Sequence, residues 1–118
     1  MGQSMAILRA LGTKYGYYTP TDFKTAYYTD VVLDCWVDMH DKSNGAILGK
    51  KSPEEHQGII DNVHVPALNV MEKQLATHGG KFIAGDKLTI ADCAMVAMLV
   101  NIWENPVGPW KEQFKPVL

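Results

Sequence analysis

The sequence predicts an all-α fold, and three features support this prediction. Residues 93–100 are all apolar, and a helix that is apolar on every side lies in a protein core or a membrane. The run is bracketed by Asp92 and Asn101, too closely for the roughly 20 residues that a membrane span needs. Helix boundaries are clear elsewhere, whereas strand signals are almost absent, since residues 81–84 are too short to found a sheet. We therefore expect a helical bundle around a buried central helix, with no membrane span.

The central helix carries its own start signal. Thr89 and Asp92 stand three residues apart just before the apolar run, which is the spacing of a capping box. The Thr89 hydroxyl is expected to accept from the Asp92 backbone N–H, and the Asp92 carboxylate from the Thr89 N–H. Leu88 and Cys93 are placed to form a hydrophobic staple across this cap.

A first helix is expected over residues 5–15, because Met5, Leu8 and Leu11 or Gly12 recur at helical spacing. Gly16 is a plausible C-terminal stop, and Ser4 the N-cap. Ser4 has two interpretations, a cap and nothing else, or part of an anion site. The second follows from the partial positive charge and outward N–H groups of a helix N-terminus.

A second helix is expected over residues 21–42, ending at residues 43–45. Its apolar face is predicted to consist of residues at i, i+4 spacing, namely Phe23, Tyr27, Val31, Cys35 and Met39. Asp30, Asp34 and Asp38 share another side, where like charges cost roughly 0.2–0.5 kcal/mol per pair. They form either a solvated acidic face or a set of carboxylates that meets a cation across an interface.

A third helix is expected to begin after Ser52 and to reach residue 77 or 78. Ser52, Pro53 and Glu55 supply an N-cap, a first-turn proline and a capping glutamate, while Gly79 and Gly80 stop the helix. The proline in its middle, Pro66, should kink it. Three histidines on this helix lack the spacing of a metal pair and are expected to be surface or partly packed residues: His56, His64 and His78.

Composition narrows the function classes. The 118 residues suit one domain, with 47% hydrophobic and 20% charged residues. The net charge of −2 lacks the basic surplus that nucleic acid or an anionic membrane would require. Cys35 and Cys93 are expected to be packing thiols, which fits a reducing compartment. Since residues 1–11 lack the features of a signal peptide, we expect a cytoplasmic protein or one in another reducing compartment.

Several motifs together resemble one family. Q-S-M-A-I-L-R-A-L at residues 3–11, the acids of the second helix, Pro66, and G-D-K-L-T-I-A-D at residues 85–92 are similar to segments of cytosolic glutathione transferases. The first of these segments resembles that of the sigma, pi, mu and alpha classes. The resemblance implies that Gln3 and Ser4 bind the γ-glutamyl carboxylate of glutathione, as substrate, without cofactor or metal. It also implies that Asp38 reaches the glutathione amino group on a partner subunit, and it places Arg9, Asp30 and Asp34 near a dimer interface.

The resemblance also implies a domain organisation. Residues 1–18 correspond to the last helix and linker of a thioredoxin-like domain, and residues 19–118 to the helical C-terminal domain. The strands and the thiol-activating residue of the family's first domain have no counterpart here. We therefore expect glutathione transferase ancestry, no catalytic residue and no activity of this chain alone. The alternative is a non-catalytic docking or structural subunit, so the partner is a homodimer mate or a larger assembly.

Overall fold

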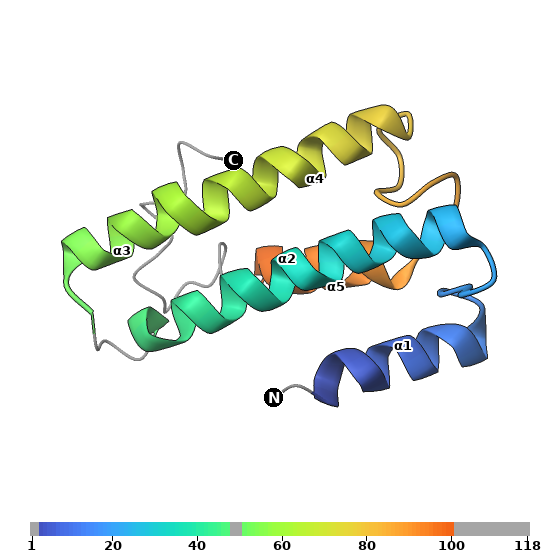
Figure 1. Ribbon diagram of the computed structural model, residues 1–118, viewed down its shortest axis with the longest axis horizontal. Coiled ribbons are helices and arrows are strands. Elements are labelled where there is room, and N and C mark those ends of the chain that lie inside the picture. Colours follow the sequence, from blue (N-terminus) through green and yellow to red (C-terminus); the bar gives the residue numbers. More distant parts are fainter. Residues whose placement is uncertain (1–2, 48–50, 101–118) are drawn as a thin grey trace.

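The structure is a computed structural model that describes residues 3–47 and 51–100, and these residues form helices and loops without a strand. The helical elements are α1 (Gln3–Tyr15), α2 (Phe23–Ile47), α3 (Pro53–Ile59), the π-helical turn η1 (Ile60–His64), α4 (Val65–Thr77) and α5 (Ile90–Met98) (Figure 1). The all-α prediction is confirmed. Within the described residues, no helix is both long and apolar enough to span a membrane.

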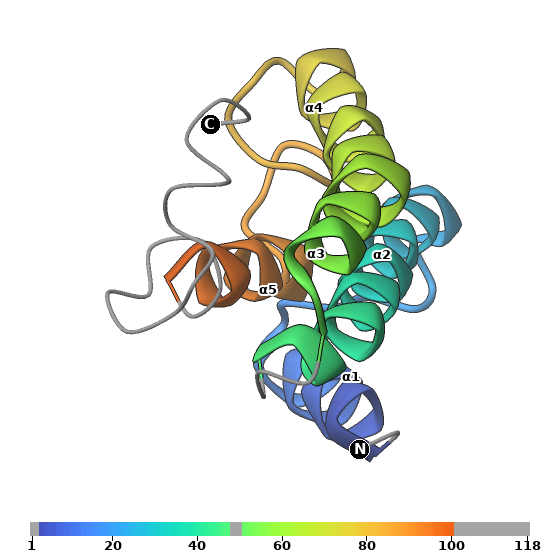
Figure 2. The same cartoon turned by 90° about the vertical axis from the view of Figure 1, so that its left-hand side faces the viewer.

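Helix α2 touches nearly every other element. It packs against α3, η1, α4 and α5, and Figure 2 shows it between the α3–α4 rod and α1, with α5 alongside. Two apolar clusters share this helix. Val32 and Met39 join the cluster formed with η1, α4 and α5, whereas Leu33 joins Ile90 and Ala94 on the side of α1.

Helix α5 lies in the core on one side only. Ala94 and Met98 are buried, and Met95 and Leu99 pack partly buried against the core. The expectation that the helix is buried all round is wrong for the described part of the chain, because its far side is solvent-exposed. That side includes Cys93, Val96, Ala97 and Val100. The neighbours α2 and α1 cover only the opposite face.

The N-terminus of α5 is fixed by the predicted capping box. The Thr89 side chain and the Asp92 carboxylate make both reciprocal contacts, and the Thr89 N–H lies 2.8 Å from Asp92 Oδ2. The second carboxylate oxygen, Oδ1, accepts from the Ile83 N–H at 2.9 Å. Asp92 therefore ties the preceding loop to the helix, a contact that the capping motif alone does not predict.

Helix α1 approaches α5 at a glycine. A Cβ atom on Gly12 would lie 2.7 Å from Ile90 Cγ2 and 2.9 Å from Tyr18 Cβ. The close approach of the two helices therefore requires a residue without a side chain at this position. The helix ends as expected at Gly16, whose φ is +80°. It begins at Gln3, however, so Ser4 lies inside the first turn and the prediction that Ser4 is the N-cap is wrong.

The predicted limits and apolar face of α2 need correction. The helix begins at Phe23, and the side chain of the preceding residue, Asp22, accepts a hydrogen bond from the Thr25 N–H at 3.3 Å. The helix continues beyond residues 43–45 to Ile47. Phe23 and Tyr27 are exposed, while Val31 and Cys35 are only partly buried. Of the predicted face only Met39 is fully buried. Because α2 is packed on two sides, the other core residues are ones that the prediction did not include: Ala26, Thr29, Val32 and Leu33.

The third predicted helix is confirmed from its start to its stop. Ser52 and Glu55 form the capping box, Pro53 lies in the first turn, and Gly79 and Gly80 have positive φ. Just before Pro66 the helix widens into one π-helical turn, η1, in which the Val65 N–H donates to the Ile60 carbonyl oxygen. This turn relieves the clash between a proline ring and the carbonyl four residues earlier.

The histidines are more buried than expected. The prediction of surface or partly packed positions is wrong for His56, which is 8% exposed, and for His64, which is fully buried. It is confirmed for His78, which is partly buried and whose Nδ1 lies 2.9 Å from Ile83 O. A neighbouring helix accounts for this burial, since α2 packs against both α3, which carries His56, and η1, which carries His64.

Candidate functional site

The first turn of α1 lies beside a cavity of mixed polar and apolar lining. Gln3 and Ser4 are both in this turn and both are exposed. The cavity has a volume of about 230 Å³ and lies between α1 and the middle of α2, lined by Ser4, Met5, Asp34, Trp36, Val37, His40 and Asp41. A helix N-terminus directs backbone N–H groups outward and carries a partial positive charge. The cavity thus has a helix end on one wall and carboxylates on the other.

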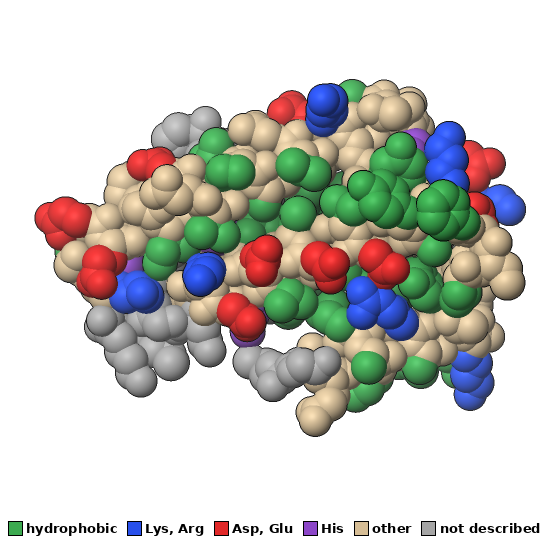
Figure 3. All heavy atoms as spheres, in the orientation of Figure 1, with side chains coloured by type: hydrophobic (Ala, Val, Ile, Leu, Met, Phe, Trp, Pro, Cys, Tyr) green, Lys and Arg blue, Asp and Glu red, His purple; other side chains and the backbone are tan. Residues whose placement is uncertain are grey.

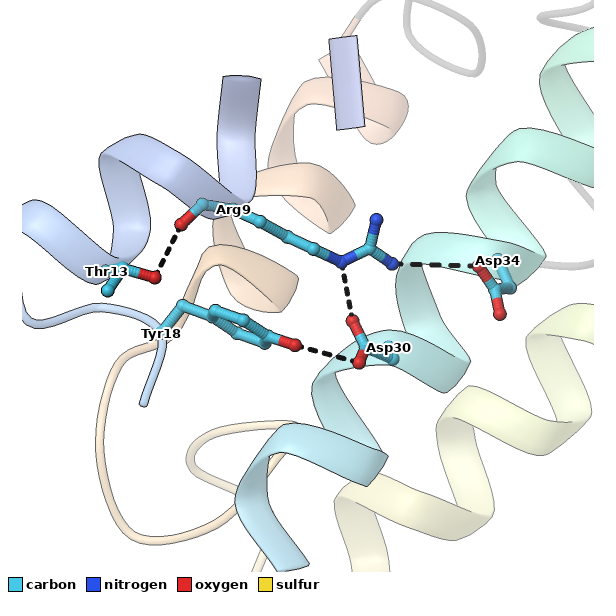
Figure 4. A network of polar contacts seen from close by, with 5 residues as sticks. All are labelled: Arg9, Thr13, Tyr18, Asp30 and Asp34. Atoms are coloured by element: carbon cyan, nitrogen blue, oxygen red, sulfur yellow. Dashed lines mark hydrogen bonds and ion pairs between the residues drawn. The ribbon is translucent and has the colours of Figure 1, made fainter. Parts of the chain in front are cut away.

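Asp30, Asp34 and Asp38 stand four residues apart on α2, along which Figure 3 shows a row of acidic side chains, but they have different partners. Asp30 is held on both oxygens: Arg9 Nε donates to Oδ1 at 2.8 Å, and the Tyr18 hydroxyl donates to Oδ2 at 2.9 Å (Figure 4). This network joins α1, the following linker and α2. The predicted interface residues Arg9 and Asp30 thus contact each other within one chain.

Asp34 and Asp38 lie in different hollows. Asp34 lines the cavity next to Ser4, is 79% exposed and has its Oδ1 atom 3.8 Å from Arg9 Nη2 (Figure 4). Asp38 lines a separate groove of about 400 Å³ between α2 and the η1–α4 segment. The other residues of that groove are Cys35, Lys42, Asn62, Val63, Pro66, Ala67 and Val70. Within one chain, therefore, the structure brings Ser4 together with Asp34 and not with Asp38.

Sequence reasoning missed two groups near this site. Tyr18 completes the Arg9–Asp30 network, and burial together with its hydrogen bond to Asp30 raises the pKa of its hydroxyl. Trp36 and His40 stack with ring centroids 5.0 Å apart and line the cavity. The helical spacing of Trp36 and His40 was a usable signal, because residues four apart share a face. Tyr18 offered no comparable signal, since its contact with Asp30 starts from a loop.

The cysteine thiols lie away from the cavity. Burial, with the charges of Asp38 and Asp34, raises the pKa of Cys35. Cys93 is exposed on α5, in an apolar groove of about 520 Å³ whose other lining residues are Leu88, Asp92, Val96, Ala97 and Val100. In the described parts of the chain, no cluster of three or more His, Cys, Asp or Glu side chains is arranged to hold a metal ion.

Helix α1 has an exposed apolar face. Ile7 is 59% exposed, Leu11 49% and Tyr15 63%, whereas Met5 and Leu8 pack partly buried against the Leu33 cluster. Scattered apolar residues on a surface need no explanation, but a row along one helix is typical of a contact surface.

Two comparisons relate the chain to known proteins. A family model described as the glutathione S-transferase C-terminal domain matches residues 37–114. The chain is also similar to glutathione S-transferase A of Cavia porcellus, with 32% identity over 108 residues, covering 88% of this chain and 48% of that protein. The chain thus spans about half the length of this curated relative. No solved structure matches it.

Proposed function

Because the chain belongs to the glutathione S-transferase family, we propose that it binds glutathione by the γ-glutamyl end, as part of a site for conjugation to electrophiles. The observation that carries this proposal is the position of Gln3 and Ser4 in the first turn of α1, beside a cavity with carboxylates on its opposite wall. The free thiols Cys35 and Cys93 fit a cytosolic site of action.

The γ-glutamyl end is a zwitterion, and the two walls suit its two charges. Its carboxylate is attracted to the N-terminus of α1, where the helix dipole and outward N–H groups favour an anion. The Ser4 hydroxyl and the Gln3 amide add side-chain donors at the same place. Its ammonium group is attracted to a carboxylate on the opposite wall. The proposed site therefore recognises an amino acid head group, and its proposed contacts do not include the thiol.

Conjugation requires activation of the glutathione thiol in addition to binding of the γ-glutamyl end. A free cysteine thiol has a pKa of about 8.5, so only a few per cent is thiolate at neutral pH. Catalysis requires a lower thiol pKa and a sulfur atom aimed at the electrophile. The proposed contacts of Gln3 and Ser4 are at the far end of the tripeptide. We therefore propose that these 118 residues bind glutathione without activating it, and have no catalytic residue of their own.

Binding is tested by calorimetric titration of the purified chain with three ligands. Glutathione and S-methylglutathione should bind alike, because the thiol is not contacted, whereas cysteinylglycine, which lacks the γ-glutamyl group, should not bind. Ser4→Ala should weaken binding, and Thr13→Ala, a hydroxyl deletion on the same helix far from its N-terminus, should not. Absence of binding by glutathione, or equal binding of cysteinylglycine, would overturn the proposal.

The lack of thiol activation is tested separately. Conjugation of glutathione to a chromogenic electrophile should proceed at the solution rate with and without the chain. A rate that rises in proportion to chain concentration, and falls in Ser4→Ala, would show that the chain activates the thiol.

A second candidate function is a docking or structural subunit of a larger assembly. The exposed apolar row of Ile7, Leu11 and Tyr15 favours it, because such a row loses its contact with water when a partner covers it. Sedimentation velocity should then show concentration-dependent association that Ile7→Gln with Leu11→Gln abolishes without changing the melting temperature. A monomer at every concentration would count against this candidate.

A further inference from the structure

We infer that the α3–η1 segment, residues 53–64, is an acid-sensitive unit of the fold, which separates from α2 on acidification while α1, α2, α4 and α5 stay packed. The inference goes beyond the proposed function, because it concerns a contact outside the cavity beside Ser4. Three observations lead to it: the side chains that the segment buries, the surroundings of its second histidine, and the point at which the segment can pivot.

The α3–η1 segment buries few side chains, and most of these are imidazoles. In this segment, all of whose residues the structure describes, the buried residues are His56, Ile60 and His64. In α5, by contrast, every buried residue is apolar: Ile90, Ala91, Ala94 and Met98. Because the hydrophobic free energy grows with the apolar area removed from water, the contact of the segment with α2 is weaker than that of α5 with α2.

His64 joins the segment to α2. Its Nε2 atom lies 2.6 Å from Ser43 Oγ, and both side chains are fully buried. A hydroxyl can donate or accept, so this contact is compatible with a neutral or a protonated ring. The charge itself is disfavoured, because burial lowers the pKa of His64 to about 4. An opening that brings the ring into water therefore becomes easier as the pH falls.

The charged side chains on the elements packed against η1 are exposed. They are Asp38, Asp41 and Lys42 in the C-terminal half of α2, Glu54 and Glu55 on α3, Asp61 on η1 itself, and Glu72 and Lys73 on α4. Two further histidines are near: His56 is buried in the same segment, and His40 of α2 stacks on Trp36 beside the cavity of Ser4. Burial, rather than a neighbouring charge, is thus the cause that keeps His64 neutral.

The segment can pivot where η1 meets α4. Pro66 has no N–H, so one backbone hydrogen bond is missing from the helical rod at this point. The Val65 N–H donates to the Ile60 carbonyl oxygen in the wider π pattern. Sharp changes of helix direction are typical of prolines and of π turns, and this junction has both. Since α3 lies at the end of the α3–α4 rod (Figure 1), the segment can move away while α4 keeps its own contacts with α2.

The expected size of the effect follows from the two pKa values of His64. The ring of an open segment binds a proton at the ordinary histidine pKa of 6.5, whereas that of the closed segment binds it only near 4. The ratio of open to closed molecules should therefore rise roughly 30-fold between pH 7.5 and pH 5. Asp and Glu side chains with ordinary pKa values, about 4, stay mostly ionised in this interval, so a change here reports a histidine.

Amide hydrogen exchange of the purified chain, read by mass spectrometry and corrected for the intrinsic pH dependence of exchange, tests the inference. Peptides from residues 53–64 should be less protected than peptides from α5 at both pH values, and their protection should fall roughly 30-fold from pH 7.5 to pH 5. In His64→Gln, whose side chain takes up no proton, this fall should be absent. Circular dichroism at pH 7.5 should show equal helix content in both proteins.

A second variant removes the partner of His64 without removing a titratable group. Ser43→Ala should lower the protection of residues 53–64 at pH 7.5 on the order of tenfold, the loss of one buried hydrogen bond. It decides the matter even where His64→Gln does not fold. Unchanged protection of residues 53–64 in Ser43→Ala would show that this contact does not hold the segment, and would overturn the inference.

Three other results would also overturn the inference. Equal protection of residues 53–64 and α5 at both pH values would show that the chain opens only as a whole. A fall in protection that persists in His64→Gln would exclude His64 as its cause. A fall that His56→Gln removes instead would assign it to the other buried histidine of the segment. None of these results bears on the proposed binding of glutathione.

Discussion

The Oγ atom of Ser43 lies 2.6 Å from Nε2 of His64, and both side chains are fully buried. The contact joins the C-terminal part of α2 to the π turn that precedes Pro66. Burial disfavours the charged imidazolium and lowers the pKa of His64 to about 4. The neutral imidazole is therefore part of the folded state, and the α2–η1 seam depends on it.

Stability should fall on acidification because of His64. The unfolded chain takes up a proton at the ordinary histidine pKa of 6.5, whereas the folded chain takes it up only near 4. The contribution is therefore complete above about pH 6.5 and is lost progressively toward pH 4, by roughly 3 kcal/mol. Urea unfolding across this range should show the slope, and His64→Gln should flatten it. An unchanged slope in His64→Gln would contradict the assignment.

Asp92 should matter more to stability than an ordinary helix cap. Asp92→Ala removes the cap of Thr89, typically about 0.5–2 kcal/mol, and leaves the Ile83 N–H without its acceptor, about 1–3 kcal/mol more. Incomplete additivity gives an expected loss of about 2–3 kcal/mol. Asp86 is an exposed acid in the loop that precedes α5, and Asp86→Ala should leave the urea midpoint unchanged. Equal midpoints for the two variants would show that Asp92 is no more than a surface charge.

Local signals in the sequence predicted several helix ends, although not the start of α1 or the limits of α2. Capping boxes and glycine stops depend on groups only a few residues apart, so a short stretch of sequence is enough to recognise them. This holds for the capping boxes at Ser52 and Thr89 and for the stops at Gly16 and Gly79. The face that a helix buries depends on its neighbours. Tyr27 is exposed and Thr29 buried because α2 is packed on two sides, and no single helical stripe describes such a position.

In the candidate site, too, the features within one helix were predicted and the contacts between elements were not. The sequence alone suggested that Ser4 begins a helix and that three aspartates share a side of α2. It did not suggest that Asp30 is occupied by Arg9 and Tyr18, because these contacts join residues 21 and 12 positions apart. Nor did it separate the hollows of Asp34 and Asp38, since residues four apart on one helix share a face. Only the packing of α1 and α4 on opposite sides of α2 distinguishes them.

The Tyr18 hydroxyl should contribute to the docking of α1. Tyr18→Phe removes one hydrogen bond to a carboxylate that Arg9 still holds, and should cost about 0.5–1.5 kcal/mol. Tyr17→Phe, the same change at an exposed neighbour, should cost nothing measurable. In spectrophotometric titration, the transition lost in Tyr18→Phe should lie above the ordinary tyrosine pKa of 10, because burial and then Asp30 disfavour the phenolate. A lost transition at or below 10 would contradict the network.

The two cysteines should differ sharply in reactivity. Cys35 is partly buried, and burial, with the charges of Asp38 and Asp34, raises the pKa of its thiol, whereas Cys93 is exposed on α5. Since the thiolate is the reactive form and burial also restricts access to the sulfur, Cys35 should react with a disulfide reagent more slowly than Cys93. Cys93→Ser should leave one slow thiol, and Cys35→Ser one fast thiol. In urea the two rates should converge, because unfolding exposes both thiols and removes the burial that raises the pKa of Cys35. A fast thiol in folded Cys93→Ser would show that α2 and α4 do not shield Cys35 as this structure describes.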